Sequence, residues 1–195
     1  MSEKPGLTRA GLIEAALELL DEVGLKGLTV RRLATDLGVK SPALYWHIRT
    51  KQELLDGMAE TILRTAGLGP PRDGERWQDW LVRRALAYRD AVQSRRDGAL
   101  VIASAARLSP EALELFDAEL GALVDAGFTP GLALETISAL SHYTTGYLLQ
   151  EQSTTAAPPS VPADSLLAAA LRAGDGGFER GVRLIVAGAE RALEG

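Results

Sequence analysis

A helical pattern that ends at Gly38 and starts again at Ser41 and Pro42 constrains the fold more than any other feature of the chain. Glycine supplies the left-handed backbone that often closes a helix, and Ser followed by Pro is typical of a helix start. Two helices joined by so short a turn form a helix-turn-helix, whose second helix can enter the major groove of DNA. The spacing predicts a recognition helix over about residues 41–48, with Ser41 as its N-cap.

Apolar residues at helical spacing predict helices along the rest of the chain, and no alternating strand pattern is visible. Thr8 and Thr29 are predicted N-caps, and Thr50 with Glu53 forms a capping box. The predicted helices besides 41–48 are 8–23, 29–37, 50–66, 76–94, 97–106, 110–126, 130–152, 165–173 and 177–193, with a Pro-rich loop at 153–165.

A segment rich in Gly and Pro at residues 67–75 interrupts this periodicity and is typical of a boundary between domains. We therefore predict an all-α protein of two domains. Residues 1–66 form a helix-turn-helix DNA-binding domain built on three helices, and residues 67–195 form a helical ligand-binding and dimerisation domain.

The charge of the chain is unevenly distributed. Its net charge is -5, but residues 24–51 contain six basic residues against Asp36 alone, a local balance of +5. The basic residues are Lys26, Arg31, Arg32, Lys40, Arg49 and Lys51. A basic patch within an acidic protein indicates a negatively charged partner such as DNA.

The predicted recognition helix carries more bulky side chains than one face can bury. Leu44 and Ile48 lie four residues apart and are expected to face inward, so Tyr45, Trp46 and His47 are expected to face outward. Exposed rings are best explained by a partner that covers them. The alternative is that Tyr45 and Trp46 pack between the first and fourth helices.

The segment GLTVRRLATDLGVKSPALYWHIRTKQELLDGM resembles the DNA-binding domain of the TetR family of transcriptional repressors. The stretches WQDWL, RRDGALV, ALSHYTTGYLLQEQ and FERGVRLIVAGAERAL resemble, in that order, the ligand-binding and dimerisation region of the tetracycline-repressor subgroup. The resemblance implies a homodimeric repressor that a small organic effector releases from its operator.

The resemblance also implies which residues contact DNA. Base edges would be approached by Arg31, Ser41, Pro42 and Ala43, and the backbone would be held mainly by Tyr45, Trp46, His47 and Lys51. Ser41 and Ala43 replace a Gln and a Thr of the tetracycline repressors, so the resemblance does not carry over an operator sequence.

Tetracycline repressors bind their drug as a magnesium chelate, and this chain departs from the residues that do so. Ile102 or Ala103 stands at the place of the metal-binding His, and Gln150 at the place of a Glu that acts through water. We predict no metal and no cofactor. The predicted effector site consists of Trp80, Arg84, Tyr88, Ile102, Glu119, Tyr143, Tyr147 and Gln150, and core packing is the alternative for each of the aromatic residues.

Small and apolar residues in the helices at 130–152 and 177–193 predict a dimer interface. The small residues are Ala133, Ala139, Ser141, Gly146, Gly181, Ala187 and Gly188. The last helix also carries an apolar surface that is wider than the core of one monomer needs to bury. The resemblance implies a four-helix bundle made of these two helices from each of two copies.

Two other functions remain open at this point. A small helical enzyme would need an acid-base pair, for which only Glu119 and His142 can be nominated, and a regulator could instead be controlled by a protein partner. The chain has no cysteine and only two histidines, which leaves little for thiol or metal catalysis. Neither a signal sequence nor a membrane span is recognisable, and we expect a cytoplasmic protein that is not an enzyme.

Overall fold

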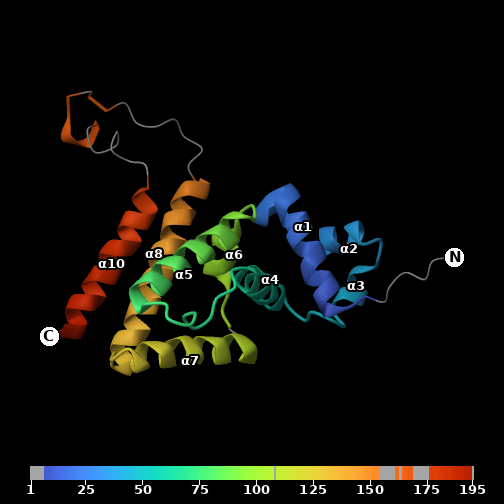
Figure 1. The fold of residues 1–195 in the computed structure, drawn as a ribbon. Coiled ribbons are helices and arrows are strands. Elements are labelled where there is room, and N and C mark those ends of the chain that lie inside the picture. The colour runs from blue at the N-terminus through green and yellow to red at the C-terminus, as the bar shows by residue number, and fades with distance from the viewer. Residues whose placement is uncertain (1–6, 108, 154–160, 163, 169–175, 195) are drawn as a thin grey trace.

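A computed structural model describes residues 7–107, 109–153, 161–162, 164–168 and 176–194, and every regular element within them is a helix. The helices are α1 (Arg9–Gly27), α2 (Val30–Asp36), α3 (Ser41–Leu44), α4 (Lys51–Thr65), α5 (Trp77–Gln93), α6 (Gly98–Ser104), α7 (Pro110–Asp125), α8 (Pro130–Ser153) and α10 (Gly177–Glu194). Helices α1, α2 and α3 lie at one end of the molecule, and α10 lies at the other end beside α8 (Figure 1). No helix among the described residues is long and apolar enough to cross a membrane.

The predicted caps at Thr8, Thr29 and Thr50 are confirmed, and Ser109 caps α7 in the same way. The hydroxyls of Thr8, Thr29, Thr50 and Ser109 each accept a hydrogen bond from the backbone N–H three residues later, which satisfies a donor that the first helical turn leaves free. Of the predicted helix at 165–173, the structure describes 165–168, of which 166–168 are helical, and the predicted loop at 153–165 lies largely outside the described residues.

The turn between α2 and α3 is built on Gly38. This residue has φ +66°, and the N–H groups of Gly38 and Val39 donate to the carbonyls of Thr35 and Ala34, which closes α2. A left-handed residue with this pair of hydrogen bonds is the usual C-terminal stop of a helix. The turn therefore sends the chain from α2 directly into α3.

Helix α3 differs from its prediction in two respects. Lys40 occupies the cap position without a side-chain cap bond, so Ser41 is the first helical residue and the prediction of Ser41 as N-cap is wrong. The regular helix ends at Leu44, whose carbonyl then accepts from both His47 and Ile48, each at 3.0 Å. Sharing one carbonyl between two N–H groups tightens the last turn and ends the regular ladder before the predicted end at residue 48.

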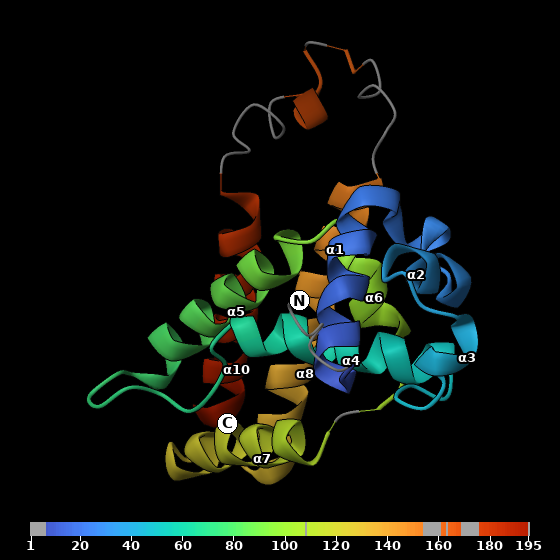
Figure 2. The ribbon, with the colours of Figure 1, turned by 90° about the vertical axis from the view of Figure 1, so that its right-hand side faces the viewer.

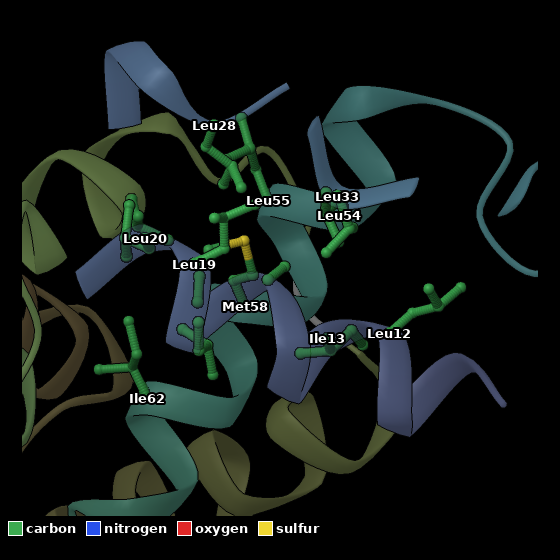
Figure 3. Close-up of a cluster of buried hydrophobic side chains, with 14 of the residues drawn as sticks. Leu12, Ile13, Leu19, Leu20, Leu28, Leu33, Leu54, Leu55, Met58 and Ile62 are labelled. Atoms are coloured by element: carbon green, nitrogen blue, oxygen red, sulfur yellow. The ribbon is translucent and has the colours of Figure 1, made fainter. Parts of the chain in front are cut away.

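A core of buried apolar residues lies mainly between α1 and α4 (Figure 3). Met58 is fully buried and lies beside Leu19 and Leu55 in that view. The same core continues into residues of three later helices, Tyr88, Ala91, Val92, Ala99, Val101 and Leu148. A second core joins α5, α7, α8 and α10 around Trp80, Leu123 and Ile137.

The two cores do not divide at the predicted domain boundary. Helix α4 contacts α1, α5 and α6. It lies between the N-terminal helices and the C-terminal ones in Figure 1, and α1 crosses in front of it in Figure 2. Asp21 of α1 pairs with Arg95 at 2.7 Å, and the Leu25 N–H donates to Asp97 at 2.7 Å. The boundary at 67–75 stays a prediction, since packing is continuous across it.

We expect Gly38→Ala to lower the free energy of unfolding by about 1 kcal/mol. The new methyl group meets nothing within 4 Å, so the loss comes from the left-handed backbone, which costs a non-glycine residue about 1–2 kcal/mol. Part of this cost is offset, because alanine lowers the conformational entropy of the unfolded chain. Gly121→Ala is the control, because Gly121 is equally open but lies within α7, where alanine is expected to stabilise. Urea denaturation at one protein concentration measures both, and a stabilised Gly38→Ala protein would contradict the assignment of strain.

Candidate nucleic-acid interface and ligand cavity

The short α3 segment separates its side chains into a buried pair and an exposed group. Leu44 and Ile48 are 2 % and 6 % exposed and hold the segment to the first core. Tyr45 is 51 % exposed and Trp46 is 88 % exposed. The alternative that both rings pack between the first and fourth helices is therefore wrong, and the outward orientation expected for them is confirmed.

The remaining predicted DNA contacts lie around these rings. Arg31 on α2 and Pro42 on α3 are exposed, Lys51 is exposed at the first position of α4, and Ser41, Ala43 and His47 are partly exposed. The eight predicted residues thus lie on α2, on α3 and the turn that follows it, and at the start of α4.

The six basic side chains between residues 24 and 51 form no ion pair with any carboxylate in the described part of the chain. All six are exposed. Glu53 lies two residues beyond Lys51, but its carboxylate accepts from the Arg49 backbone N–H at 2.9 Å and lies 3.8 Å from Arg9. These cations are therefore free to bind phosphate oxygens, and Arg49 and Lys51 adjoin the N-terminal amides of α4.

A cavity of about 680 Å³ lies among α4, α5, α7 and α8 and the end of α6. Its wall contains four of the predicted effector residues, Arg84, Tyr88, Ile102 and Glu119. Half of the other lining residues are apolar, including Leu63, Leu68, Leu115, Phe116 and Ile137, and most of the wall surface that faces the cavity is apolar. An apolar cavity with a few polar groups is the usual form of a site for a small organic molecule.

The polar groups in the deep wall of this cavity bind one another. Arg84 donates from Nε and Nη2 to the two carboxylate oxygens of Glu119, at 2.9 and 2.8 Å, and both residues are buried. The hydroxyls of Tyr88 and Thr145 are hydrogen bonded at 2.9 Å, and burial raises the pKa of Tyr88 despite that bond. Tyr88 is therefore a neutral group at physiological pH.

The other four predicted effector residues lie outside this cavity. Trp80 is fully buried, and its Nε1–H donates to the Gly69 carbonyl at 2.8 Å. Tyr143 and Tyr147 pack against Phe178 of α10, with ring centroids 5.5 and 5.2 Å away. Gln150 is exposed near the end of α8 and is absent from the cavity wall.

Sequence reasoning missed the contribution of α4 to the cavity. Asp56, Ala59, Glu60, Leu63 and Arg64 all line it, and none of them was among the predicted effector residues. The available signal was that these residues lie on the side of the helix away from Leu54 and Met58.

Asp56 and Gln52 also tie α4 to the end of α6. Asp56 accepts from the Ala106 N–H at 2.8 Å, and Gln52 donates to the Ser104 carbonyl at 2.7 Å. Burial raises the pKa of Asp56, but the backbone N–H groups of Ala106 and Arg107 and the Gln52 amide outweigh it, so the pKa lies below its ordinary value. Asp56 is therefore ionised at physiological pH, and its bonds fix the rim of the cavity to α4.

The outer surfaces of α8 and α10 differ from the surfaces that pack within the chain. A Cβ at Gly181 would collide with the Tyr143 ring, so that glycine allows α10 to approach α8 of the same chain. A Cβ at Gly146 or Gly188 would meet nothing within 4 Å, and Leu184 is 75 % exposed. These last three positions face away from the cores of the chain.

Comparison with known proteins gives matches along nearly the whole chain. Residues 12–58 match the description "Bacterial regulatory proteins, tetR family", and residues 70–174 match "Tetracyclin repressor-like, C-terminal domain". The tetracycline repressor protein class C of Escherichia coli is 39 % identical over an alignment of 201 positions, which covers 95 % of this chain and 91 % of that protein.

Two solved structures agree in fold. A TetR variant from Acinetobacter baumannii in complex with minocycline is 36 % identical, with a TM-score of 0.86 over 97 % of this chain and 96 % of that chain. A class A TetR in complex with 5a,6-anhydrotetracycline and magnesium is also 36 % identical, with a TM-score of 0.77 over 97 % of this chain and 99 % of that chain.

We expect Leu44→Ala and Trp46→Ala to have very different effects on stability. Leu44 is buried, so its truncation should lower the free energy of unfolding by about 2–5 kcal/mol, whereas loss of the exposed Trp46 ring should change it by no more than about 0.5 kcal/mol. Thermal and urea denaturation of the two variants measure this difference. A large loss of stability in Trp46→Ala would show that the ring supports the fold instead of facing solvent.

Proposed function

Because the chain belongs to the TetR family of bacterial regulatory proteins, we propose that its exposed α3 surface binds operator DNA and that its cavity holds the effector that ends repression. Members of this family are DNA-binding transcriptional repressors and not enzymes, and this chain is a repressor of that type. The observation that carries the proposal is the exposure of Tyr45 and Trp46 beside cations that have no carboxylate partner among the described residues.

The residues around α3 divide into two roles in this proposal. Arg31 and the start of α3, with Ser41, Pro42 and Ala43, approach base edges, where side-chain donors and apolar groups distinguish one base pair from another. Tyr45, Trp46, His47 and Lys51 hold the phosphate backbone, which fixes the orientation of α3 in the groove. Such a repressor acts where the chromosome is, in the bacterial cytoplasm.

TetR-family proteins bind DNA as dimers, and we infer that α8 and α10 form the interface here. Exposed Leu184, together with Gly146 and Gly188, whose open surfaces permit close helix approach, supports this placement. Two-fold symmetry would set the two α3 segments about 34–36 Å apart, which is one turn of DNA.

The effector of this chain is best described as an organic molecule bound without magnesium. One solved relative holds anhydrotetracycline and magnesium, but no group of three or more His, Asp or Glu residues among the described residues of this chain is placed to hold a metal ion. The resemblance places Ile102 or Ala103 where the metal-binding His stands; Ile102 lines the cavity, and neither side chain has a ligand atom. The residues present therefore do not fit a magnesium chelate, and apolar contact supports binding instead.

Helix α4 supports a mechanism for release from DNA, because it begins at Lys51 beside α3 and contributes five residues to the cavity wall. An effector that prefers one position of α4 shifts the spacing of the two α3 segments. To change a 1:99 population into 99:1, it must bind the released state about 5.5 kcal/mol more tightly.

The two alternatives differ in how the cavity would be used. An enzyme would need Glu119 as an acid or base, but its carboxylate already binds Arg84 and the Gly69 N–H. A regulator controlled only by a protein partner would have no need of a cavity of about 680 Å³ that touches α4. A thermal-shift screen of metabolites separates that case, since a ligand at 100 times its dissociation constant adds about 2.7 kcal/mol.

A band-shift assay with the region upstream of the chain's own gene tests the proposal directly, and failure to bind at low salt would contradict it. We expect Lys51→Ala to weaken binding to all sequences alike and to reduce the slope of log affinity against log salt by about 1, because one phosphate contact is lost. Arg76→Ala is the control, since it removes the same charge at the start of α5. Equal effects of the two substitutions would mean that only net charge matters.

We expect Leu184→Asp to convert the dimer into monomers and to abolish specific operator binding. A buried carboxylate at a helix interface is strongly unfavourable, whereas it is harmless on a surface that faces water. Leu113→Asp is the matched control, because Leu113 is 53 % exposed and lies on α7, outside the two helices of the proposed interface. Sedimentation analysis measures both, and a dimeric Leu184→Asp protein would place the interface elsewhere.

A further inference from the structure

Glu119 of α7 makes one contact that cavity lining does not explain. Its Oε1 accepts a hydrogen bond from the Gly69 backbone N–H at 3.0 Å, in addition to the bond from Arg84 Nε. Gly69 lies four residues beyond Thr65, the last residue of α4. The carboxylate therefore joins three parts of the chain: α5, α7 and the connection that leaves α4.

Gly69 is hydrogen bonded at both its backbone N–H and its carbonyl. While its N–H binds Glu119, its carbonyl accepts from Trp80 Nε1 at 2.8 Å, and the Trp80 side chain is fully buried. Its backbone has φ +152°, and a Cβ at this position would lie 3.4 Å from Leu115 Cδ1. A residue fixed at both backbone polar groups and by its dihedral angles has little freedom to move by itself.

A carboxylate is needed at position 119 because the site is buried and presents three hydrogen-bond donors to it. Glu119 is 1 % exposed and Arg84 is 5 % exposed, so water does not replace either partner. A carboxylate has enough acceptor capacity for Arg84 Nε, Arg84 Nη2 and the Gly69 N–H together. An amide in its place has one acceptor oxygen, and its NH₂ group would face a guanidinium donor or the Gly69 N–H.

We propose that Glu119 is a positioning residue that fixes the cavity end of α4 through Gly69, and that Arg84 is the counter-charge that holds Glu119 in place. This inference rests on the proposed function, because the position of α4 matters through the α3 surface at its other end. Arg84, Glu119 and Leu68 all line the cavity, so a molecule bound there lies against the contact that sets where α4 ends.

The test uses the full-length dimer and DNA from upstream of its own gene. We expect Glu119→Gln to weaken operator binding by about tenfold and to speed hydrogen exchange of the Gly69 amide, with the dimer and its helix content unchanged. Glu114→Gln is the control, since Glu114 is exposed on the same helix, and its affinity should stay within about twofold of the original protein. Affinity for Glu119→Gln equal to that of the control would overturn the inference.

A second variant separates positioning from the stability of the buried pair. Arg84→Met combined with Glu119→Met removes both charges and leaves neither unpaired, so the fold is retained, but it also removes the acceptor for Gly69. We expect the same loss of operator affinity and the same fast exchange at Gly69. A double variant that binds operator as tightly as the original protein would overturn the role of Glu119. If the original protein itself failed to bind operator, that result would contradict the proposed function instead.

Discussion

Helix α4 packs against the N-terminal helices on one side and lines the cavity on the other. The position of the α3 end relative to the cavity depends on these two contacts. One side carries Leu54, Leu55 and Met58 into the core shared with α1. The other side contributes Ala59 and Leu63 to the cavity wall. Because a packed helix moves as a unit, a displacement at the cavity also moves its first turn, which adjoins α3. The bonds of Gln52 and Asp56 to the end of α6 add a polar link to the same helix.

The helices were predictable from the sequence because caps and stops are local. A threonine or serine hydroxyl three residues before a free N–H needs no distant partner, and Gly38 closes α2 by its own backbone conformation. The start of α3 was placed one residue late, because a helix that begins at Ser41 and one capped by Ser41 give the same pattern of residues. The burial of Leu44 against the first core, which sequence spacing expresses only in part, fixes the observed register.

The cavity was predictable only in part, since its wall joins residues that are distant in sequence. Arg84 and Glu119 were nominated from a resemblance, but their pairing depends on how α5 and α7 both pack on α8. Small residues raise the same difficulty on α10. Gly181 and Gly188 are identical in sequence terms, yet one admits the Tyr143 ring of its own chain and the other faces open space. Composition indicates close helix approach, and only the packed structure tells which helix approaches.

The way the cavity wall satisfies its polar groups determines what kind of molecule it favours. Arg84 and Glu119 neutralise each other, Tyr88 binds Thr145, and Asp56 binds backbone N–H groups, so the wall has no buried charge that requires a counter-ion. A ligand that placed a lone charge among Arg84 and Glu119 would have to separate the pair, which leaves one buried charge unpaired. In the proposed function, contact with the apolar wall provides the binding free energy, and the cost of separating Arg84 from Glu119 disfavours charged ligands. Since the same pair holds the end of α4 through Gly69, molecules that disturb the pair are also those that alter the position of the DNA-binding end.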